Sequence, residues 1–338
     1  MPALRVFVRD FQPAQFISGV YTLQNCQLGQ TKGGKPYLRC LLADRTGRTP
    51  GRMWNMTEDL FRALPTDGFV FIEGQTQPYQ GEMQVIIQSI KAITPGEEDL
   101  ADLLPSSARD PREMLDELKR IVEWVEHPGL RNLVHAYLDD AAFVEKFLQA
   151  PAASNLHHAY LGGLIEHTLS VMKLAELVVP LYPQVNRDVV LVGLFLHDLG
   201  KCGELCWHAG FSYSDDGQLV GHIGRGLVWL NDKAKVVAER GTPLSKPLLR
   251  VLEHIILSHH GQPEFGALKV PATPEAIAVS LIDNLDAKMH MAVAATRGED
   301  AAANAKCEEL GGHFTEKVWA LETRLYRPDP TTLAEDAP

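Results

Sequence analysis

The chain has 338 residues, of which 45% are hydrophobic and 22% are charged, and its formal net charge is −11. This is the composition of a soluble globular protein, and no apolar run approaches the ~18–20 residues of a membrane span. Charges within the first apolar patch argue against a signal peptide. Five cysteines in a chain of this length do not make a disulfide framework. We therefore expect reduced thiols, a cytoplasmic location and no membrane partner.

The charge is divided unevenly along the chain. Residues 1–95 hold ten Lys or Arg and seven Asp or Glu, whereas the remainder holds 22 and 36. The front of the chain therefore carries a net charge of +3 and the rest carries −14. A basic front and an acidic remainder predict two domains with different tasks.

Residues 1–95 contain five short runs of β-branched and aromatic residues, separated by Gly-, Asn- and Asp-containing turns. The predicted strands cover 16–28, 36–44, 49–55, 68–79 and 82–93, and a short helix is predicted over 58–65. Five short strands in about 80 residues fit a small closed barrel. We therefore predict an OB-like, nucleic-acid-binding β-barrel domain.

The pattern changes to helical after a Pro-, Ser- and acid-rich stretch, which we interpret as a linker over 96–112. From 113 to 325, apolar residues recur at spacings of three and four, which predicts an all-α domain. The acidic, Pro-containing tail over 326–338 is predicted to be disordered. The fold class expected is multidomain α+β, a barrel followed by a helical bundle.

None of the thirteen histidines lies in the predicted barrel, and many stand at the ends of predicted helices. The stretch LFLHDLGK, residues 194–201, shows the pattern most clearly, because an apolar helix ends in His197 and Asp198. We expect Gly200 to let the chain turn away and Lys201 to follow at the rim. Metal sites in helical bundles are built in this way, from side chains on facing helices.

Imidazole and carboxylate ligands together suit Mn, Fe, Zn, Ni or Co rather than calcium. An aspartate between two groups of histidines can bridge two ions about 3.5–4 Å apart, and such a pair activates water for in-line displacement at phosphorus. Lys201 would then screen the charge on a phosphate oxygen. Any single histidine is more often structural than a ligand, but a cluster at helix ends with two acids favours a metal site.

These residues resemble the HD-domain superfamily of metal-dependent phosphohydrolases, and the longer motifs resemble its YhaM family of 3′–5′ exoribonucleases. The motifs are HHAYLGGLIEHTLSV, GLFLHDLGK, GHIGRG, LSHHGQPEFGAL and IDNLDAKM. With an OB-like module in front, the resemblance covers about residues 12–325. It implies a 3′–5′ polarity and activation by manganese or cobalt.

The resemblance also implies roles for matching positions. His167, His197, Asp198 and Asp283 would hold a first ion, and Asp198 would bridge to a second. The second ion would be completed by His222 and His259, with His260 as a further candidate ligand. Lys201, His158 and Arg225 would face the scissile phosphate and, with Asp198, act in catalysis.

The predicted barrel offers basic and aromatic side chains for single-stranded nucleic acid, whose backbone follows a basic groove and whose bases stack on rings. The candidates are Lys32, Lys35, Tyr37, Arg39, Arg48, Arg52, Trp54 and Tyr79. Each is equally compatible with a structural role in the barrel. The modest charge of +3 predicts weak, salt-sensitive affinity.

Together with the resemblance, which alone implies the 3′–5′ polarity, these observations predict a metal-dependent 3′–5′ exonuclease that hydrolyses single-stranded RNA, or single-stranded DNA, to nucleoside 5′-monophosphates. The expected cofactor is a pair of divalent ions, Mn²⁺ first, with Co²⁺, Fe²⁺, Ni²⁺ or Zn²⁺ as alternatives. Two other functions stay open: a phosphohydrolase of free or cyclic nucleotides, and a non-catalytic nucleic-acid-binding adaptor. Apolar faces left on the helices are compatible with a homo-oligomer.

Overall fold

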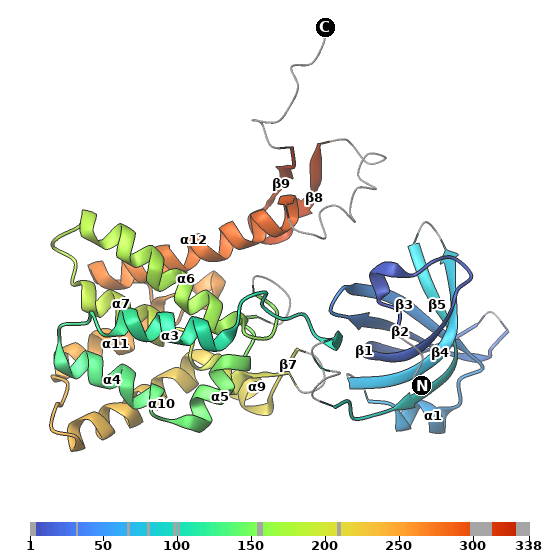
Figure 1. The fold of residues 1–338 in the computed structure, drawn as a ribbon, viewed down its shortest axis with the longest axis horizontal. Helices are drawn as coiled ribbons and strands as arrows, with labels where there is room; N and C mark the ends of the chain where they lie inside the picture. Colours follow the sequence, from blue (N-terminus) through green and yellow to red (C-terminus); the bar gives the residue numbers. More distant parts are fainter. Residues whose placement is uncertain are drawn as a thin grey trace, which may run out of the picture.

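The computed structural model describes residues 5–31, 33–65, 68–79, 82–96, 100, 102–153, 158–207, 211–297 and 313–328. A β-barrel and a helical domain lie side by side, joined by the segment that follows the last barrel strand (Figure 1). None of the helices within these ranges is long and apolar enough to cross a membrane.

The N-terminal strands form a closed barrel in the order β1-β2-β3-β5-β4. They are β1 (Phe16–Gln30), β2 (Pro36–Asp44), β3 (Gly47–Trp54), β4 (Gly68–Tyr79) and β5 (Glu82–Ala92). Neighbouring strands are antiparallel except β3 and β5, which are parallel. The helix α1 (Glu58–Ala63) lies between β3 and β4 and begins at Thr57, whose side chain accepts a hydrogen bond from the backbone N–H of Leu60. This is the predicted OB-like barrel with its predicted short helix.

The barrel interior is filled by alternate residues of each strand, among them Tyr21, Leu38, Leu42 and Ile72, all fully buried. Burial of these side chains provides the main stabilisation of the barrel. A short 3₁₀ turn, Val8–Asp10, precedes the first strand, and the Val8 backbone N–H donates to Asp44 at 2.7 Å. The chain before β1 is thereby attached to the end of β2.

The segment between the barrel and the helices is more than a polar connection. Leu103 and Leu104 are buried, and they pack with Phe69 of β4 on one side and with Leu161 and Phe211 of the helical domain on the other. In addition, Asp102 forms an ion pair with Arg45 of the barrel at 3.1 Å. Two apolar residues within a Pro- and acid-rich stretch therefore pack against both parts of the molecule.

The helical domain is built around α7 (Arg187–Leu196), whose residues from Val189 to Leu196 are all buried. Asn186 caps this helix by accepting from the Val189 backbone N–H. The other long helices are α3 (Pro111–Val122), α4 (Pro128–Leu138), α5 (Ala141–Gln149), α6 (Gly163–Val178), α10 (Gly221–Glu239), α11 (Lys246–Ser258) and α12 (Pro274–Arg297). Helices α4, α6, α11 and α12 contact α7. Because α7 is enclosed on all sides, its sequence from Val189 to Leu196 has no polar face.

Shorter elements connect these helices. They are the 3₁₀ turns Val179–Leu181 and Pro263–Phe265, the helices α8 (Lys201–Glu204) and α9 (Asp215–Leu219), and a small ladder of β6 (Leu205–Cys206) with β7 (Ser212–Tyr213).

The expectation of helix as far as residue 325 is wrong at its end. The strands β8 (Phe314–Val318) and β9 (Thr323–Tyr326) form a hairpin around a 3₁₀ turn, Trp319–Leu321, beyond the end of α12 (Figure 1). Aromatic and β-branched residues such as Phe314, Thr323 and Tyr326 favour a strand over a helix. Tyr326, which we expected in a disordered tail, belongs to β9, and residues 329–338 of that predicted tail lie outside the described residues.

Candidate metal centre and nucleic-acid surface

Five helices bring imidazole and carboxylate side chains to one place in the helical domain. His197 and Asp198 directly follow α7, and His259 and His260 directly follow α11. The remaining candidates lie on neighbouring helices: His167 on α6, His222 on α10 and Asp283 on α12. All seven side chains proposed as ligands are therefore brought together, in two groups that share Asp198.

The first group consists of the Nε2 atoms of His167 and His197 with one oxygen each of Asp198 and Asp283. The two nitrogens are 3.3 Å apart. His167 Nε2 lies 3.2 Å from Asp283 Oδ1 and 3.8 Å from Asp198 Oδ2. His197 Nε2 lies 3.4 Å from Asp198 Oδ2 and 3.7 Å from Asp283 Oδ1. Ligand atoms about 2.1 Å from one ion are themselves about 3–3.4 Å apart, so these four atoms are spaced to surround an ion.

The second group consists of His222, His259, His260 and the other oxygen of Asp198. The Nε2 atoms of His222 and His260 are 3.1 Å apart. Asp198 Oδ1 lies 3.7 Å from His222 Nε2 and 3.5 Å from His259 Nε2. Two imidazole nitrogens that face one another at this distance are in the arrangement of two ligands on one ion.

Asp198 stands between the two groups, with Oδ2 turned to the first and Oδ1 to the second. Within the described part of the chain, Asp198 Oδ1 and His259 Nε2 are buried without a hydrogen-bond partner. Such atoms are rare, because leaving a buried polar atom unpaired costs about 1–3 kcal/mol. An ion bound by both atoms would satisfy them. The residues present therefore fit a site for two ions bridged by Asp198.

The histidines are also oriented as metal ligands usually are. In four of them an oxygen holds Nδ1 and leaves Nε2 directed into the site, an arrangement that fixes the ring and its tautomer. The partners are the carboxylate of Asp286 for His167 (2.8 Å), the carboxylate of Glu204 for His222 (3.0 Å), and the backbone carbonyls of Leu194 for His197 (2.7 Å) and Ile256 for His259 (2.8 Å).

The protonation states suit a site for cations. Burial alone would raise the pKa of Asp198, but Lys201 and His197 hold that pKa well below its usual range. Burial alone would lower the pKa of His197, but the neighbouring carboxylates raise it to about 10. Burial and an adjacent imidazole lower the pKa of His260 to about 3. At neutral pH the carboxylate is therefore ionised and His260 is neutral, the states that ligands require, whereas His197 is protonated and must release its proton to bind an ion.

Gly200 is explained by a close approach of two backbone segments. Its φ of −58° and ψ of −20° are helical values that any residue can adopt. A Cβ at this position would lie 2.0 Å from the carbonyl oxygen of His222. Gly200 lies in the turn after α7, as expected, but it is the close approach, rather than the turn, that requires a glycine. Its lack of a side chain lets the start of α10 pack on the loop after α7, which brings His222 to Asp198.

Asp286 is a buried carboxylate that the sequence analysis did not select. Its Oδ2 lies 2.8 Å from His167 Nδ1 and 3.1 Å from His158 Nε2, and its Oδ1 accepts a hydrogen bond from Ser170. Asp286 follows Asp283 by three residues on α12, and residues three apart share a helix face. That spacing is a signal from which it could have been found.

The short helix α8 contributes charged side chains at both of its ends. Lys201 Nζ lies 2.7 Å from Asp198 Oδ2, so this lysine contacts the proposed bridging ligand directly. Glu204 Oε1 lies 3.0 Å from both the backbone N and the Nδ1 of His222. No sequence pattern marks Glu204, because its contact depends on how α10 folds against α8.

His158 and Arg225, proposed with Lys201 to face the phosphate, lie in different surroundings. His158 has a left-handed φ of 51°, and its ring nitrogens lie 2.6 Å from the Tyr160 hydroxyl and 3.1 Å from Asp286. It therefore reaches the ligands through Asp286. Arg225 is on α10, and its Nε lies 2.7 Å from the carboxylate of Asp216 on α9.

Five of the eight nucleic-acid candidates form a continuous surface on the barrel. Tyr37 of β2 lies opposite Trp54 of β3, with ring centroids 5.2 Å apart. In the same pair of strands Arg39 lies opposite Arg52, whose guanidinium is 4.9 Å from the ring centroid of Tyr79. Trp54 and Tyr79 are 44% and 46% exposed, so both side chains are accessible from solvent.

Of the other three candidates, the structure describes the positions of two. Lys35 is exposed in the turn before β2. Arg48 pairs with Ala43 at the far end of β3, six residues from Trp54 and thus about 20 Å away along the strand. Lys32 lies outside the described residues.

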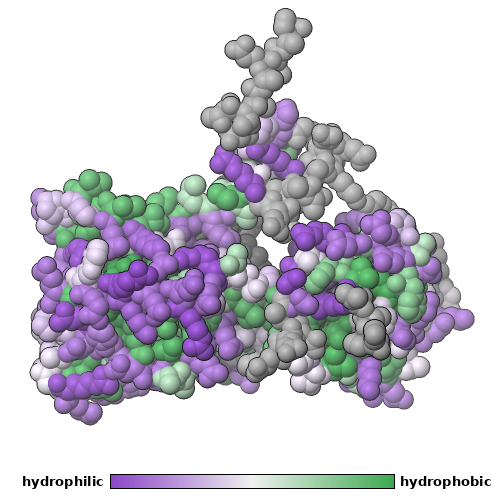
Figure 2. Space-filling view, in the orientation of Figure 1, coloured by the Kyte–Doolittle hydropathy of each residue, from purple (hydrophilic) through white to green (hydrophobic). Residues whose placement is uncertain are grey.

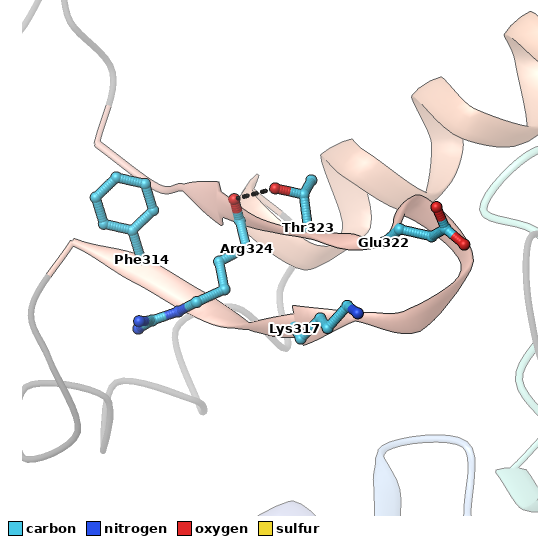
Figure 3. Close-up of a pocket in the computed structure, with 5 residues that line it drawn as sticks. All are labelled: Phe314, Lys317, Glu322, Thr323 and Arg324. Atoms are coloured by element: carbon cyan, nitrogen blue, oxygen red, sulfur yellow. Dashed lines mark hydrogen bonds between the residues drawn. The ribbon is translucent and has the colours of Figure 1, made fainter.

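One hollow lies beside the metal centre and another lies away from it. One, of about 270 Å³, adjoins His158 and is lined by Arg109 and by Glu166, Ser170 and Lys173 of α6, with leucines beside them. The other, of about 510 Å³, is an open hollow on the β8–β9 hairpin. Figure 3 shows its lining residues, Phe314, Lys317, Glu322, Thr323 and Arg324, none of which belongs to the metal centre. The first hollow is thus the one placed beside the candidate ligands.

Comparison with known proteins gives two kinds of match along the chain. A family model described as the HD domain matches residues 164–288. The 3′–5′ exoribonuclease YhaM of Geobacillus sp. (strain WCH70) is 33% identical over 302 residues, which are 89% of this chain and 88% of that protein. The 3′–5′ exoribonuclease YhaM of Bacillus pumilus (strain SAFR-032) is 31% identical over 302 residues, 89% of this chain and 91% of that protein.

Among solved structures, the second OB-fold domain of replication protein A from Methanococcus maripaludis matches with a TM-score of 0.21 and 16% identity. It covers 28% of this chain and 98% of that chain. A similarity of this size carries no argument, and the barrel assignment rests on the strand order described above.

Proposed function

The chain belongs to the YhaM family of 3′–5′ exoribonucleases and is a hydrolytic nuclease, and from this premise we propose that it shortens single-stranded RNA from the 3′ end with the help of two divalent metal ions. The products are nucleoside 5′-monophosphates. Mn²⁺ is the proposed ion, and Co²⁺, Fe²⁺, Ni²⁺ and Zn²⁺ share its preference for mixed imidazole and carboxylate ligands.

The observation that carries the proposal is the position of Asp198. Its two oxygens face two separate groups of histidine nitrogens, and one of those oxygens is buried without a hydrogen-bond partner among the described residues. Two ions held in this way would supply an activated water and would stabilise the charge on the reacting phosphate. His167, His197, Asp283 and Asp198 would hold the first ion, and Asp198, His222, His259 and His260 would hold the second.

Side chains around the ligands orient them and receive the substrate's phosphate. Lys201 donates a hydrogen bond to Asp198, which places its ammonium group beside the proposed bridging carboxylate. His158 acts through Asp286 in the free enzyme. Arg109 and Lys173 add positive charge to the hollow next to His158, although both also pair with Glu117. We propose this hollow as a place where the strand approaches the metal centre.

The barrel supplies affinity for the strand in this proposal. Single-stranded nucleic acids bind to surfaces that combine stacking rings with positive charge, and each stacked base contributes about 1–3 kcal/mol. Here the exposed rings of Trp54 and Tyr79 offer surfaces for stacking, and the guanidinium of Arg52 offers positive charge. Because these contacts involve rings and phosphates rather than base edges, we expect little sequence preference. DNA strands are expected to bind in the same way.

A cytoplasmic location is part of the proposal. It is supported by the cysteines in the described part of the chain, Cys26, Cys40, Cys202 and Cys206, all of which are free thiols.

The test uses one RNA labelled at either end. With Mn²⁺, a 5′-labelled strand is expected to give a ladder that shortens from the 3′ end, while a 3′-labelled strand releases its label at once as a mononucleotide. Chromatography should identify that product as a 5′-monophosphate, and EDTA should stop the reaction. Internal fragments of the 3′-labelled strand, or equal turnover with EDTA, would refute the proposal. Single-stranded DNA of the same sequence measures the sugar preference.

A further inference from the structure

An apolar ridge runs along the outer side of α12, where about half of each side chain is open to solvent. Its members recur every fourth residue, and all are exposed by about half: Ile277 (47%), Leu281 (63%), Leu285 (45%), Met289 (54%) and Val293 (46%). Single exposed apolar residues are ordinary on protein surfaces, whereas a contiguous row marks an interaction site.

The surface continues beyond the ridge onto the end of α6 and the 3₁₀ turn that follows it. Leu177, Leu181 and Tyr182 are 73%, 74% and 56% exposed. Helix α6 packs on α12, and the backbone N–H of Asn186 donates to Glu275 in the first turn of α12, so this end of α6 lies beside the start of the ridge. Figure 2 shows hydrophobic residues gathered along the upper edge of the helical domain, over these helices.

The size of this surface matches a stable protein interface. With about 200 Å² for a fully exposed side chain of this size, the eight residues offer roughly 900 Å² of accessible surface. A specific protein–protein interface buries about 800 Å² on each partner. The apolar area is therefore enough for one stable contact, and it exceeds the patches of about 300–600 Å² found on typical monomers.

We infer that this surface binds the same surface of a second copy of the chain, with α12 packed against α12 around a twofold axis near Leu285. Side chains four residues apart form a ridge inclined to the helix axis, and two such ridges interdigitate when the helices cross at about 50°. A twofold contact requires a self-complementary patch. The ridge meets this requirement, because Leu285 is its midpoint, with Leu281 and Met289 on either side and Ile277 and Val293 at its ends.

The contact would support the helix that carries two carboxylates of the metal centre. Asp283 and Asp286 project from the other side of α12, toward His167. Packing the outer side of α12 against a second copy would hold this helix from both sides. The inference rests on exposure and spacing, and it is independent of which substrate the enzyme cleaves.

The mass of the full-length protein in solution tests the inference. Sedimentation equilibrium of the wild type at micromolar concentrations is expected to give at least twice the chain mass of 37.4 kDa. Leu281→Glu combined with Leu285→Glu should weaken association by at least 100-fold and leave a folded monomer, because both side chains are exposed. Val228→Glu is the matched control: it is an apolar residue of similar exposure, 47%, on α10, and its mass should equal that of the wild type.

Cross-linking of a second variant locates the twofold axis and does not depend on a loss of association. Leu285→Cys is expected to form a disulfide-linked dimer under mild oxidation, whereas Val228→Cys is not. A monomeric wild type would overturn the inference. So would an oligomer that keeps its mass in the Leu281→Glu, Leu285→Glu variant, or one in which Leu285→Cys and Val228→Cys cross-link equally.

Discussion

Replacing Asp286 with asparagine tests how strongly the proposed ligands depend on the side chains behind them. The carboxylate lies 2.8 Å from His167 Nδ1 and 3.1 Å from His158 Nε2, and it also accepts from Ser170. Asparagine has nearly the same shape, so the fold should survive. It carries no negative charge, however, and one of its two acceptor oxygens becomes a donor NH₂ group. His167 would therefore keep its position. It would lose the negative charge of the neighbouring Asp286, which makes its Nε2 a strong ligand.

The expected magnitude follows from the position of Asp286 behind a single ligand. Loss of such a supporting group lowers metal affinity by about 10- to 100-fold. Each tenfold change corresponds to about 1.4 kcal/mol of binding free energy. Only one ligand of the first group contacts Asp286, and the second group rests on other residues. We therefore expect tight binding of one Mn²⁺ and weakened binding of the other.

The assay is a calorimetric titration of metal-free protein with Mn²⁺, and Asp188→Asn is the matched control. Asp188 accepts hydrogen bonds from the backbone N–H groups of Glu126 and His127, neither of which is a proposed metal ligand. Its variant should bind both ions with wild-type affinity. If Asp286→Asn changed both affinities less than threefold, the reasoning about support behind His167 would be refuted.

The remaining predictions concern the bridge, the glycine, the barrel rings and the ions. Asp198→Ala should reduce hydrolysis at least 1,000-fold, while the RNA affinity in a fluorescence anisotropy titration changes less than threefold. Cleavage that persists while binding is lost would contradict the assignment of hydrolysis to the metal centre and of binding to the barrel. Gly200→Ala should lower the free energy of unfolding in urea by about 1–3 kcal/mol, because the alanine Cβ would meet the backbone of His222. The variant should also bind Mn²⁺ more weakly. Wild-type values for both quantities would count against the contact with His222. Trp54→Ala should cost about 1–3 kcal/mol of RNA-binding free energy. Trp319 is an exposed tryptophan outside the barrel, so Trp319→Ala should change the affinity little. Equal losses in the two variants would argue against a specific stacking surface. Mn²⁺ at 100 times its Kd should stabilise the wild type by about 2.7 kcal/mol in thermal unfolding, and an equal gain in Asp198→Ala would show that the ion binds elsewhere.

The barrel could be predicted from the sequence because its information is local. Alternation along each strand marks the inward residues, and turn residues separate the strands. The same holds for α7, since an uninterrupted apolar run from Val189 to Leu196, followed by the His197–Asp198 pair, indicates a buried helix that ends at the site. The grouping of histidines at helix ends then brought the candidate ligands into view without knowledge of how the helices pack.

The features that the sequence did not reveal depend on packing between distant segments. Gly200 has an unremarkable backbone conformation, and its importance comes from the carbonyl of His222 on another helix. Glu204 is one of many acidic residues until α10 folds against it. Leu103 and Leu104 occur in a stretch whose composition is that of a linker, yet they are buried against both the barrel and the helices.

The measurement that tests the account most directly is anomalous diffraction at the manganese edge from crystals of the full chain grown with Mn²⁺. The account predicts two peaks about 3.5–4 Å apart, one on each side of the Asp198 carboxylate. The first should lie between His167, His197 and Asp283, and the second between His222, His259 and His260. A single peak, or peaks that do not contact Asp198, would contradict the proposed two-ion centre.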